Sequence, residues 1–277
     1  TALHAEMEMY IQDPTRPLNR CDFYNEELGV LNTEAEENLD YGVASSSYTA
    51  AVALNPDDEV ALLWLGDIKL TLGEAQESLR HYEEILRVLK AKHGDNPHPY
   101  IAATLNNLGM AYHALGEAPK AIAYHEESLA MQKVIYGDKP HPDIAACLGN
   151  LGMAYNDLGD AAKSIVYLEE SLVMDRLIYG DESHPSIATT LGNLGQAYKA
   201  LEDTAKAILY FEESLAMRKL IYGDKPHPDI AISLNNLGAV YTGLGDWSKA
   251  MAYYEESLAM QKLIYGDKPH PDIAASL

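Results

Sequence analysis

The sequence predicts an all-α protein built as a solenoid of stacked helix hairpins, and three observations lead to this prediction. The dipeptide His-Pro returns every 43 residues, beginning at positions 98, 141, 184, 227 and 270. Each unit contains two stretches with the apolar spacing of an amphipathic helix, and no strand-like alternation competes with them. Because one helix hairpin cannot bury its apolar faces alone, successive hairpins are expected to stack.

The first helix of each unit is expected to begin at the His-Pro dipeptide. Pro142 suits the first helical position, where its missing N–H costs no hydrogen bond, and Asp143 lies favourably at the positive end of the helix dipole. Gly116, like Gly159 and Gly245, should end the helix or open the turn. The apolar stripe in between is formed in unit 98–140 by Ile101, Leu105, Leu108, Tyr112 and Leu115.

The second helix is expected to begin beside an acidic residue. Asp160, Asp203 and Asp246 are plausible N-caps, and Glu117 takes their place in unit 98–140. This helix should end at Gly137 with a left-handed cap. Its paired glutamates, as in the motif EESL, are expected to form a solvated outer face, partly balanced by Lys120, Lys163, Lys206 and Lys249.

The repeat divides the chain into segments. Four full units cover 98–140, 141–183, 184–226 and 227–269, and 270–277 is the truncated start of a further one. Residues 59–97 form a degenerate unit. Residues 1–58 are an N-terminal helical segment, a cap or an earlier degenerate repeat, with 1–32 ambiguous. We expect the chain to be a fragment, because it begins without methionine and stops inside a repeat.

Composition limits the classes of partner. The 277 residues are 47% hydrophobic and carry a formal charge of −22, which disfavours nucleic acid and anionic membranes and favours basic or neutral partners. No apolar window is long enough for a transmembrane helix. Cys21 and Cys147 are too few and too far apart for a disulfide framework, which fits an intracellular, cytoplasmic protein.

The repeated residues resemble a known family. Leu105, Leu108, Gly109, Tyr112 and Gly116, with the small and aromatic positions that follow, are similar to tetratricopeptide repeats in the lengthened form of kinesin light chains. The resemblance covers about residues 59–277, and the extended second helix (MQKVIYGD) lengthens the unit beyond the usual length of about 34 residues. It implies a right-handed superhelix whose first helices line a concave groove.

One position of the first helix raises a functional question. Asparagine, a mediocre helix former, recurs there in every full unit. On a helical wheel Asn107 lies opposite Leu105 and Leu108, flanked by Asn106, as Asn235 flanks its counterpart in unit 227–269. We call this set the asparagine row: Asn107, Asn150, Asn193 and Asn236.

Three explanations of the asparagine row remain open. An amide can bond both the N–H and the C=O of a peptide backbone, so the row could hold an extended segment regardless of its sequence. The repeat domain of O-linked N-acetylglucosamine transferase, which this region resembles, uses asparagines in this way. Alternatively, the asparagines bond a neighbouring helix and fix the spacing between units, or they are idle products of duplication.

Two further rows on the same helices vary between units, as partner selection requires. We call them the methionine row (Met110, Met153, Gln196, Ala239) and the third row (His113, Asn156, Lys199, Thr242). They are nearly neutral, which argues against an acidic ligand of the kind that kinesin light chains hold in a basic groove. In the degenerate unit, Trp64 occupies the position equivalent to Asn107. Two roles remain open for it: a packed core residue, or an anchor for the end of a ligand.

The sequence offers no catalytic or metal-binding constellation. The five His-Pro histidines occur once per unit, so stacking would hold them about 10 Å apart, too far for shared metal ligation. Adjacent glutamates on a helix point about 100° apart, and no nucleophile motif or phosphate loop is present.

We therefore expect a non-enzymatic scaffold without cofactor or metal, which binds a peptide or helix of a partner protein in its groove. The alternative is a regulatory or sensor module of a larger multidomain protein, for example an NTPase or transferase. End-to-end self-stacking through the truncated C-terminal face is a third possibility.

Overall fold

The computed structural model describes residues 59–94, 96–137, 139–180, 182–223 and 225–266. The regular elements in these ranges are all α-helices, as the repeat predicts. The segments 1–58 and 270–277, for which the sequence predicts a helical or degenerate N-terminal part and a truncated repeat, lie outside the described residues.

The helices alternate between two lengths, one pair per unit. The first helices of the units are α5 (Glu59–Thr71), α7 (Pro99–Ala114), α9 (Pro142–Asp157), α11 (Pro185–Ala200) and α13 (Pro228–Gly243). The second helices are α6 (Ala75–His93), α8 (Ala118–Tyr136), α10 (Ala161–Tyr179), α12 (Thr204–Tyr222) and α14 (Trp247–Tyr265).

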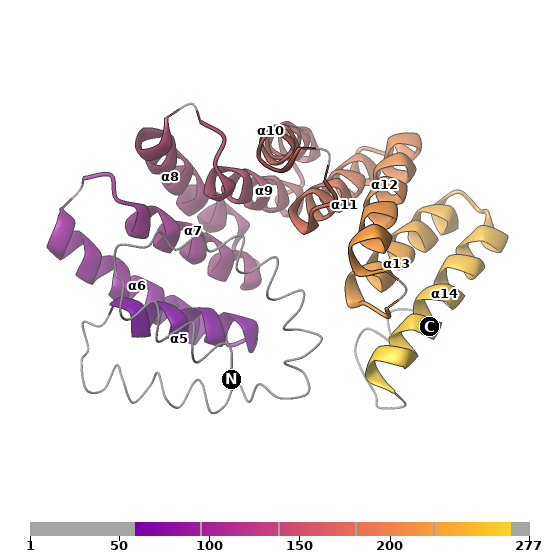
Figure 1. The fold of residues 1–277 in the computed structure, drawn as a ribbon, viewed down its shortest axis with the longest axis horizontal. Helices are drawn as coiled ribbons and strands as arrows, with labels where there is room; N and C mark the ends of the chain where they lie inside the picture. Colours follow the sequence, from indigo (N-terminus) through magenta and orange to yellow (C-terminus); the bar gives the residue numbers. More distant parts are fainter. Residues whose placement is uncertain (1–58, 95, 138, 181, 224, 267–277) are drawn as a thin grey trace.

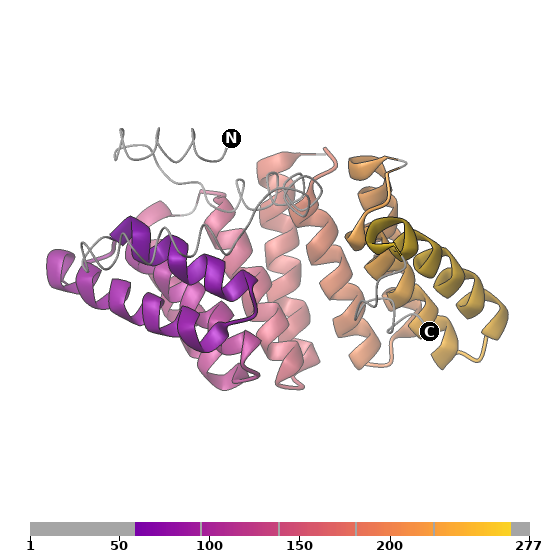
Figure 2. The same cartoon turned by 90° about the horizontal axis from the view of Figure 1, so that it is seen from below.

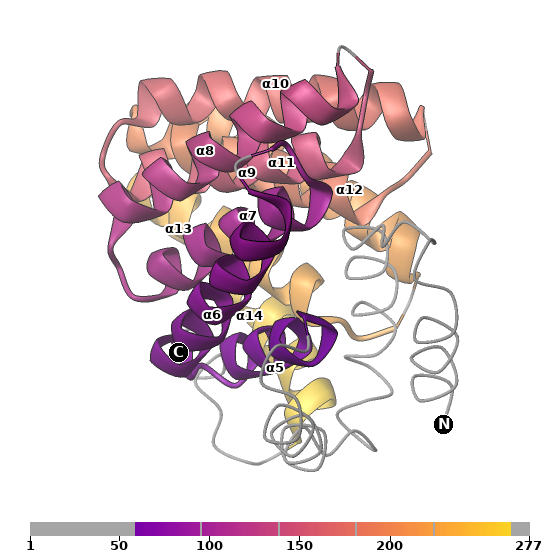
Figure 3. The same cartoon turned by 90° about the vertical axis from the view of Figure 1, so that its left-hand side faces the viewer.

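The helix pairs follow one another along an arc (Figure 1), with the first helices on its inner side and the second helices on its outer side. Seen from below, the pairs stand side by side along the long axis (Figure 2). Seen from the end that carries α5 and α6, successive pairs point in progressively different directions (Figure 3). The architecture is therefore an all-α solenoid, and its concave face is made by the first helices.

The first helices begin as the sequence predicts, and the histidine does more than precede the proline. His141, His184 and His227 are the N-caps, and each Nδ1 accepts a hydrogen bond of 3.2 Å from the backbone N–H two residues later. Each imidazole also stacks, at 3.4–3.5 Å between ring centroids, on the tyrosine that ends the preceding helix. The His-Pro dipeptide thus joins one unit to the next.

The acidic residues before the second helices cap them, as expected. Asp160, Asp203 and Asp246 each accept a hydrogen bond from the backbone N–H three residues later. Glu117 makes no such side-chain bond. Gly137 and its counterparts end these helices with φ of 64–67° and ψ between −138° and −152°. This backbone conformation is accessible almost only to glycine and lies outside the left-handed helical region that the sequence suggested.

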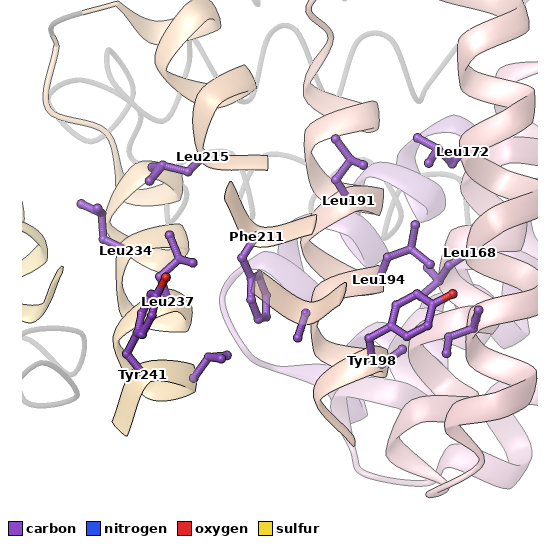
Figure 4. Packing of buried hydrophobic residues seen from close by; sticks show 14 of the residues in the cluster. Leu168, Leu172, Leu191, Leu194, Tyr198, Phe211, Leu215, Leu234, Leu237 and Tyr241 are labelled. Carbon is purple, nitrogen blue, oxygen red and sulfur yellow. The ribbon is translucent and has the colours of Figure 1, made fainter. Parts of the chain in front are cut away.

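The core lies between the two helices of a unit and between neighbouring units. Figure 4 shows leucines and aromatic rings of α10, α11, α12 and α13 filling this space. The helices approach closely at a glycine position that recurs in every described unit, where a Cβ atom on Gly195 would lie 2.6 Å from the ring of Phe211. The same arrangement brings Gly109 against His125 in unit 98–140.

The lysines predicted to balance the EESL glutamates do not do so. Lys120, Lys163, Lys206 and Lys249 pair instead with the acidic residue three positions earlier and lie over tyrosine rings of the first helices. The second glutamate of each EESL motif pairs with a base in the last turn of the preceding unit's second helix. These pairs are Lys90–Glu127, Lys133–Glu170, Arg176–Glu213 and Lys219–Glu256.

Candidate functional site on the concave face

The residues predicted to line the groove lie on the first helices, at their partly or fully exposed positions. The half-buried members are Asn106, Asn107, Asn150, Asn193, Asn235, Asn236, Met153, Gln196, His113 and Asn156, and the exposed ones are Met110 and Lys199. These helices form the inner side of the arc (Figure 1), so the predicted rows belong to the helices that make the concave face.

The asparagine row meets the preceding unit at the methionine-row position. The Asn107 amide donates a hydrogen bond of 3.0 Å to Oδ1 of Asp67, which occupies the methionine-row position of the degenerate unit. Asp67 is buried and also accepts a hydrogen bond from the Tyr82 hydroxyl. Asn236 makes the equivalent contact, since its Oδ1 accepts a 3.0 Å hydrogen bond from Nε2 of Gln196.

Asn150 uses a different partner because Met110 occupies the methionine-row position before it. Its Nδ2 donates to Oδ1 of Asn106 at 3.2 Å, and the same oxygen lies 2.9 Å from Nδ1 of His125. His125 is buried, and burial lowers its pKa from 6.5 to about 3, with the charge of His113 acting in the same direction. The neutral ring therefore donates its Nδ1–H to Asn106, which joins the core to the groove.

Asn193 is the exception in the row. Among the described residues, its amide has no hydrogen-bond partner. The two positions that serve the other asparagines are here occupied by Met153, which is apolar, and by Gly149, which has no side chain. In the preceding unit, three residues after Met153, the buried Oδ1 of Asn156 also has no hydrogen-bond partner in the part of the chain that the structure describes.

Few charges interrupt the lining. In the third row His113 lies 3.4 Å from Asp157, and Lys199 is exposed. Two apolar side chains of the first helices are also exposed: Met110 at 40% and Ile232, one turn before Asn236, at 47%. Trp64 is half-buried. The concave face is thus mainly amide, small and apolar in character.

Sequence reasoning included two partners of the asparagine row, Asn106 and Gln196, in the predicted site but missed the third, Asp67. It also missed His125, which bonds Asn106 from the core. Asp67 could have been found, because it lies 43 residues before Met110 in the same row. His125 breaks the pattern of an apolar or aromatic residue at its position, which was a usable signal of a buried polar network.

Two absences complete the description of the site. In the described ranges, no three or more His, Cys, Asp or Glu side chains are grouped so that they could hold a metal ion. Nor do those ranges include a helix with the length and apolarity needed to cross a membrane.

Comparison with known families agrees with this architecture. Models of the tetratricopeptide repeat match residues 57–134, 100–177, 143–219 and 230–272. The chain belongs to the tetratricopeptide repeat family. No curated protein sequence matches it as a relative.

Solved structures of other proteins are similar in fold. BtubC (BKLC) from P. vanneervenii is 22% identical, with a TM-score of 0.64 over 83% of this chain and 92% of that one. A kinesin light chain from Podosopora anserina, with nearly identical repeats, is 23% identical, with a TM-score of 0.60 over 77% and 99%. A Rap protein complexed with Competence and Sporulation Factor is 16% identical, with a TM-score of 0.64 over 76% and 55%. These likenesses show that the chain shares the fold of those proteins.

Proposed function

We propose that this tetratricopeptide repeat protein is a non-enzymatic scaffold that binds an extended or helical segment of a partner protein in its concave groove. The observation that carries the proposal is the row of half-buried amides along the inner helices, interrupted by few charges. Amides complement the peptide backbone, and half-burial strengthens their hydrogen bonds relative to open solvent.

The charge of the groove residues also favours a neutral or basic segment as the ligand. The only exposed lysine among the three rows is Lys199, so an acidic peptide would find few cations there. The variable side chains of the methionine and third rows would select the partner. Two similar structures are complexes, a Rap protein with Competence and Sporulation Factor and the Cut9–Hcn1 hetero-tetramer, and they agree with use of this fold for protein binding.

A pull-down from cell extract with charge-matched variants tests the proposal. The groove variant is Met110→Glu with Ile232→Glu, both at exposed positions of the inner helices. The control is Leu177→Glu with Leu220→Glu, at positions 66% and 75% exposed on outer helices. Partners should be lost with the groove variant and kept with the control, while circular dichroism shows equal helicity. Loss with the control alone would place binding on the convex face and contradict the proposal.

A further inference from the structure

We infer that the convex face of the solenoid at α10 and α12 is a contact surface for a second copy of this chain, related to the first by a two-fold axis. The inference is independent of the proposed function, because a contact on the convex face leaves the groove of each copy on the far side of the molecule. The variant Leu177→Glu with Leu220→Glu should therefore separate the two copies and still capture groove partners.

The first observation is an apolar stripe along each of the two helices. On α10 the stripe consists of Val166, Val173 and Leu177, which are 60–66% exposed and follow the spacing i, i+7 and i+11 of one helix face. The equivalent positions of α12 hold Leu209, Ala216 and Leu220. The two leucines of α12 are 59% and 75% exposed. Exposed apolar side chains that are grouped rather than scattered mark a surface used for association.

The two stripes lie side by side. Arg176 of α10 and Glu213 of α12 form an ion pair of 3.0 Å across the junction between the units, so the exposed faces of these helices are neighbours. Figure 1 shows α10 at the top of the arc, with α12 following it along the outer side. We call the two stripes together the apex patch.

The apex patch lies where two convex surfaces can meet. Two arcs placed back to back touch at their apices and diverge toward their ends. The row of Leu177 stays apolar from Val134 to Leu263, but the rows of Val166 and Val173 do not continue with large apolar residues toward the ends. On α6, α8 and α14 these two rows hold Arg80, Arg87, Ala123, Ala130, Ala252 and Ala259. The largest apolar surface is thus placed at the apex.

The charges of the apex patch favour a second copy as the occupant. The chain carries a formal charge of −22, so like-charge repulsion opposes self-association over the molecule as a whole. Within the patch, the glutamates of the two stripes are each paired with a base, Glu170 with Lys133 at 3.3 Å and Glu213 with Arg176 at 3.0 Å. A surface with both signs is self-complementary under a two-fold axis, because Arg176 of one copy can face a glutamate of the other.

The size of the apex patch is sufficient for a small specific interface. Each of the two helices has 19 residues and is therefore roughly 28 Å long, and together they present a strip roughly 20 Å wide. The two copies would cover about 1,100 Å² in total, slightly above the roughly 1,000 Å² that a specific interface needs. We expect a dissociation constant of about 1–100 μM for an interface of this size.

The test is the mass of the full chain in solution, measured by sedimentation equilibrium at concentrations up to about 200 μM, above the expected dissociation constant. The wild type should approach twice the monomer mass and stop there, because a two-fold contact closes on itself. Val166→Glu with Val173→Glu should raise the dissociation constant at least about 100-fold, since the contact would have to bury unpaired carboxylates.

The repeat supplies a matched control for this variant. Ala252→Glu with Ala259→Glu adds the same two charges at the equivalent exposed positions of α14 and should change the dissociation constant less than about threefold. Val166→Ser with Val173→Ser removes apolar area without adding charge and should weaken the dimer about tenfold. Because all four substituted positions are exposed, circular dichroism should show equal helicity in every variant.

Three results would overturn the inference. The first is a wild-type chain that stays monomeric over the whole concentration range, which would leave the apex patch to a different protein. The second is a dimer that the α10 variants leave intact, or that the α10 and α14 variants weaken equally. The third is a mass that keeps rising beyond the dimer, because end-to-end stacking of units is an open association that does not close.

Discussion

At the residue scale, His125 shows how one change within near-identical repeats creates a polar connection. The corresponding positions hold Leu168, Phe211 and Tyr254, all of which pack against the glycine of the first helix. An imidazole fits the same space but brings a buried N–H that needs an acceptor, and Asn106 supplies it. The pair joins the core to the groove, so its energetics can be measured by unfolding the protein without a ligand.

Asn106→Ala should lower the free energy of unfolding by about 1–3 kcal/mol, because it leaves the buried Nδ1–H of His125 unsatisfied. In a His125→Phe background, where the ring matches Phe211, the same substitution should cost less than about 0.5 kcal/mol. Urea denaturation of the four proteins gives the coupling between the two sites, expected near 1 kcal/mol or above. Additive effects would show that the hydrogen bond contributes nothing.

The same histidine should make stability depend on pH. Burial lowers the pKa of His125 from 6.5 to about 3, so the folded protein leaves it neutral while the unfolded chain takes up a proton below about pH 6.5. The contribution is therefore fully present above that pH and is lost as pH falls toward 3. Between pH 7 and pH 5 the wild type should lose about 2 kcal/mol more than His125→Phe.

Denaturant midpoints of both proteins at the two pH values test this dependence. Other titrating groups are shared by the two proteins, so the difference isolates His125. If the two proteins lose stability in parallel, the imidazole is protonated in the folded state and the burial argument fails.

At the element scale, the turn between the helices of a unit follows a rule with one exception. Gly73, Gly116, Gly159 and Gly245 occupy this turn with φ between 73° and 85°. In unit 184–226 the position is Glu202, which has φ of 61° and is the one non-glycine residue with positive φ in the described ranges. A side chain in this conformation costs roughly 1–2 kcal/mol through contact with the following carbonyl group.

Glu202→Gly should therefore raise the free energy of unfolding by about 0.5–1 kcal/mol, the relief of strain less the added entropy of the unfolded chain. The matched reverse change, Gly159→Ala, should lower it by about 1 kcal/mol. Chemical denaturation of the two variants beside the wild type provides the test. A destabilised Glu202→Gly variant would mean that the glutamate side chain contributes more than its backbone costs.

The elements were predictable from the sequence, whereas the use of individual groove residues was not. Pro142, Asp160 and Gly137 act within their own helix or turn, so local rules placed the helix ends correctly. The state of the Asn150 amide depends on a residue 44 positions earlier, and that of Asn107 on one 40 positions earlier. The repeat shows which units adjoin, but it does not show which side-chain atoms meet across the junction.

At the scale of the whole molecule, stability is a sum over units and their junctions, because each of the described units makes its extensive contacts with its neighbours along the solenoid. Because the units are nearly identical, a unit could stack against the wrong neighbour during folding. In α8, α10, α12 and α14 a buried polar residue near the helix end differs between successive units and distinguishes the junctions, whereas α6 carries Leu89 at this position. These residues are Gln132, Asp175, Arg218 and Gln261.

The hydrogen-bond partners of these buried polar residues, which lie on the next unit, also differ from junction to junction. Asp175 accepts hydrogen bonds from Ser186 at 2.8 Å and Thr190 at 3.5 Å. Arg218 donates to the backbone oxygen of Asp229 at 2.6 Å and to Ser233 at 3.0 Å. Ser186 occupies the position that holds Asp143 in unit 141–183 and Asp229 in unit 227–269. The acidic member of the row, Asp175, thus lies before the unit in which this position is not acidic. A carboxylate at both positions of one junction does not occur in the described units.

This pairing gives a test of how unit order is specified. Ser186→Asp would place a second carboxyl group within hydrogen-bonding distance of the buried Asp175, and should cost about 2–4 kcal/mol through like-charge repulsion and desolvation. Adding Asp175→Gln recreates the residues of the preceding junction, Gln132 with Asp143, and should recover most of the loss. Urea denaturation of the two single variants and the double variant measures the rescue. If the double variant is no more stable than Ser186→Asp alone, the buried row does not match units to one another, and their order must come from apolar packing.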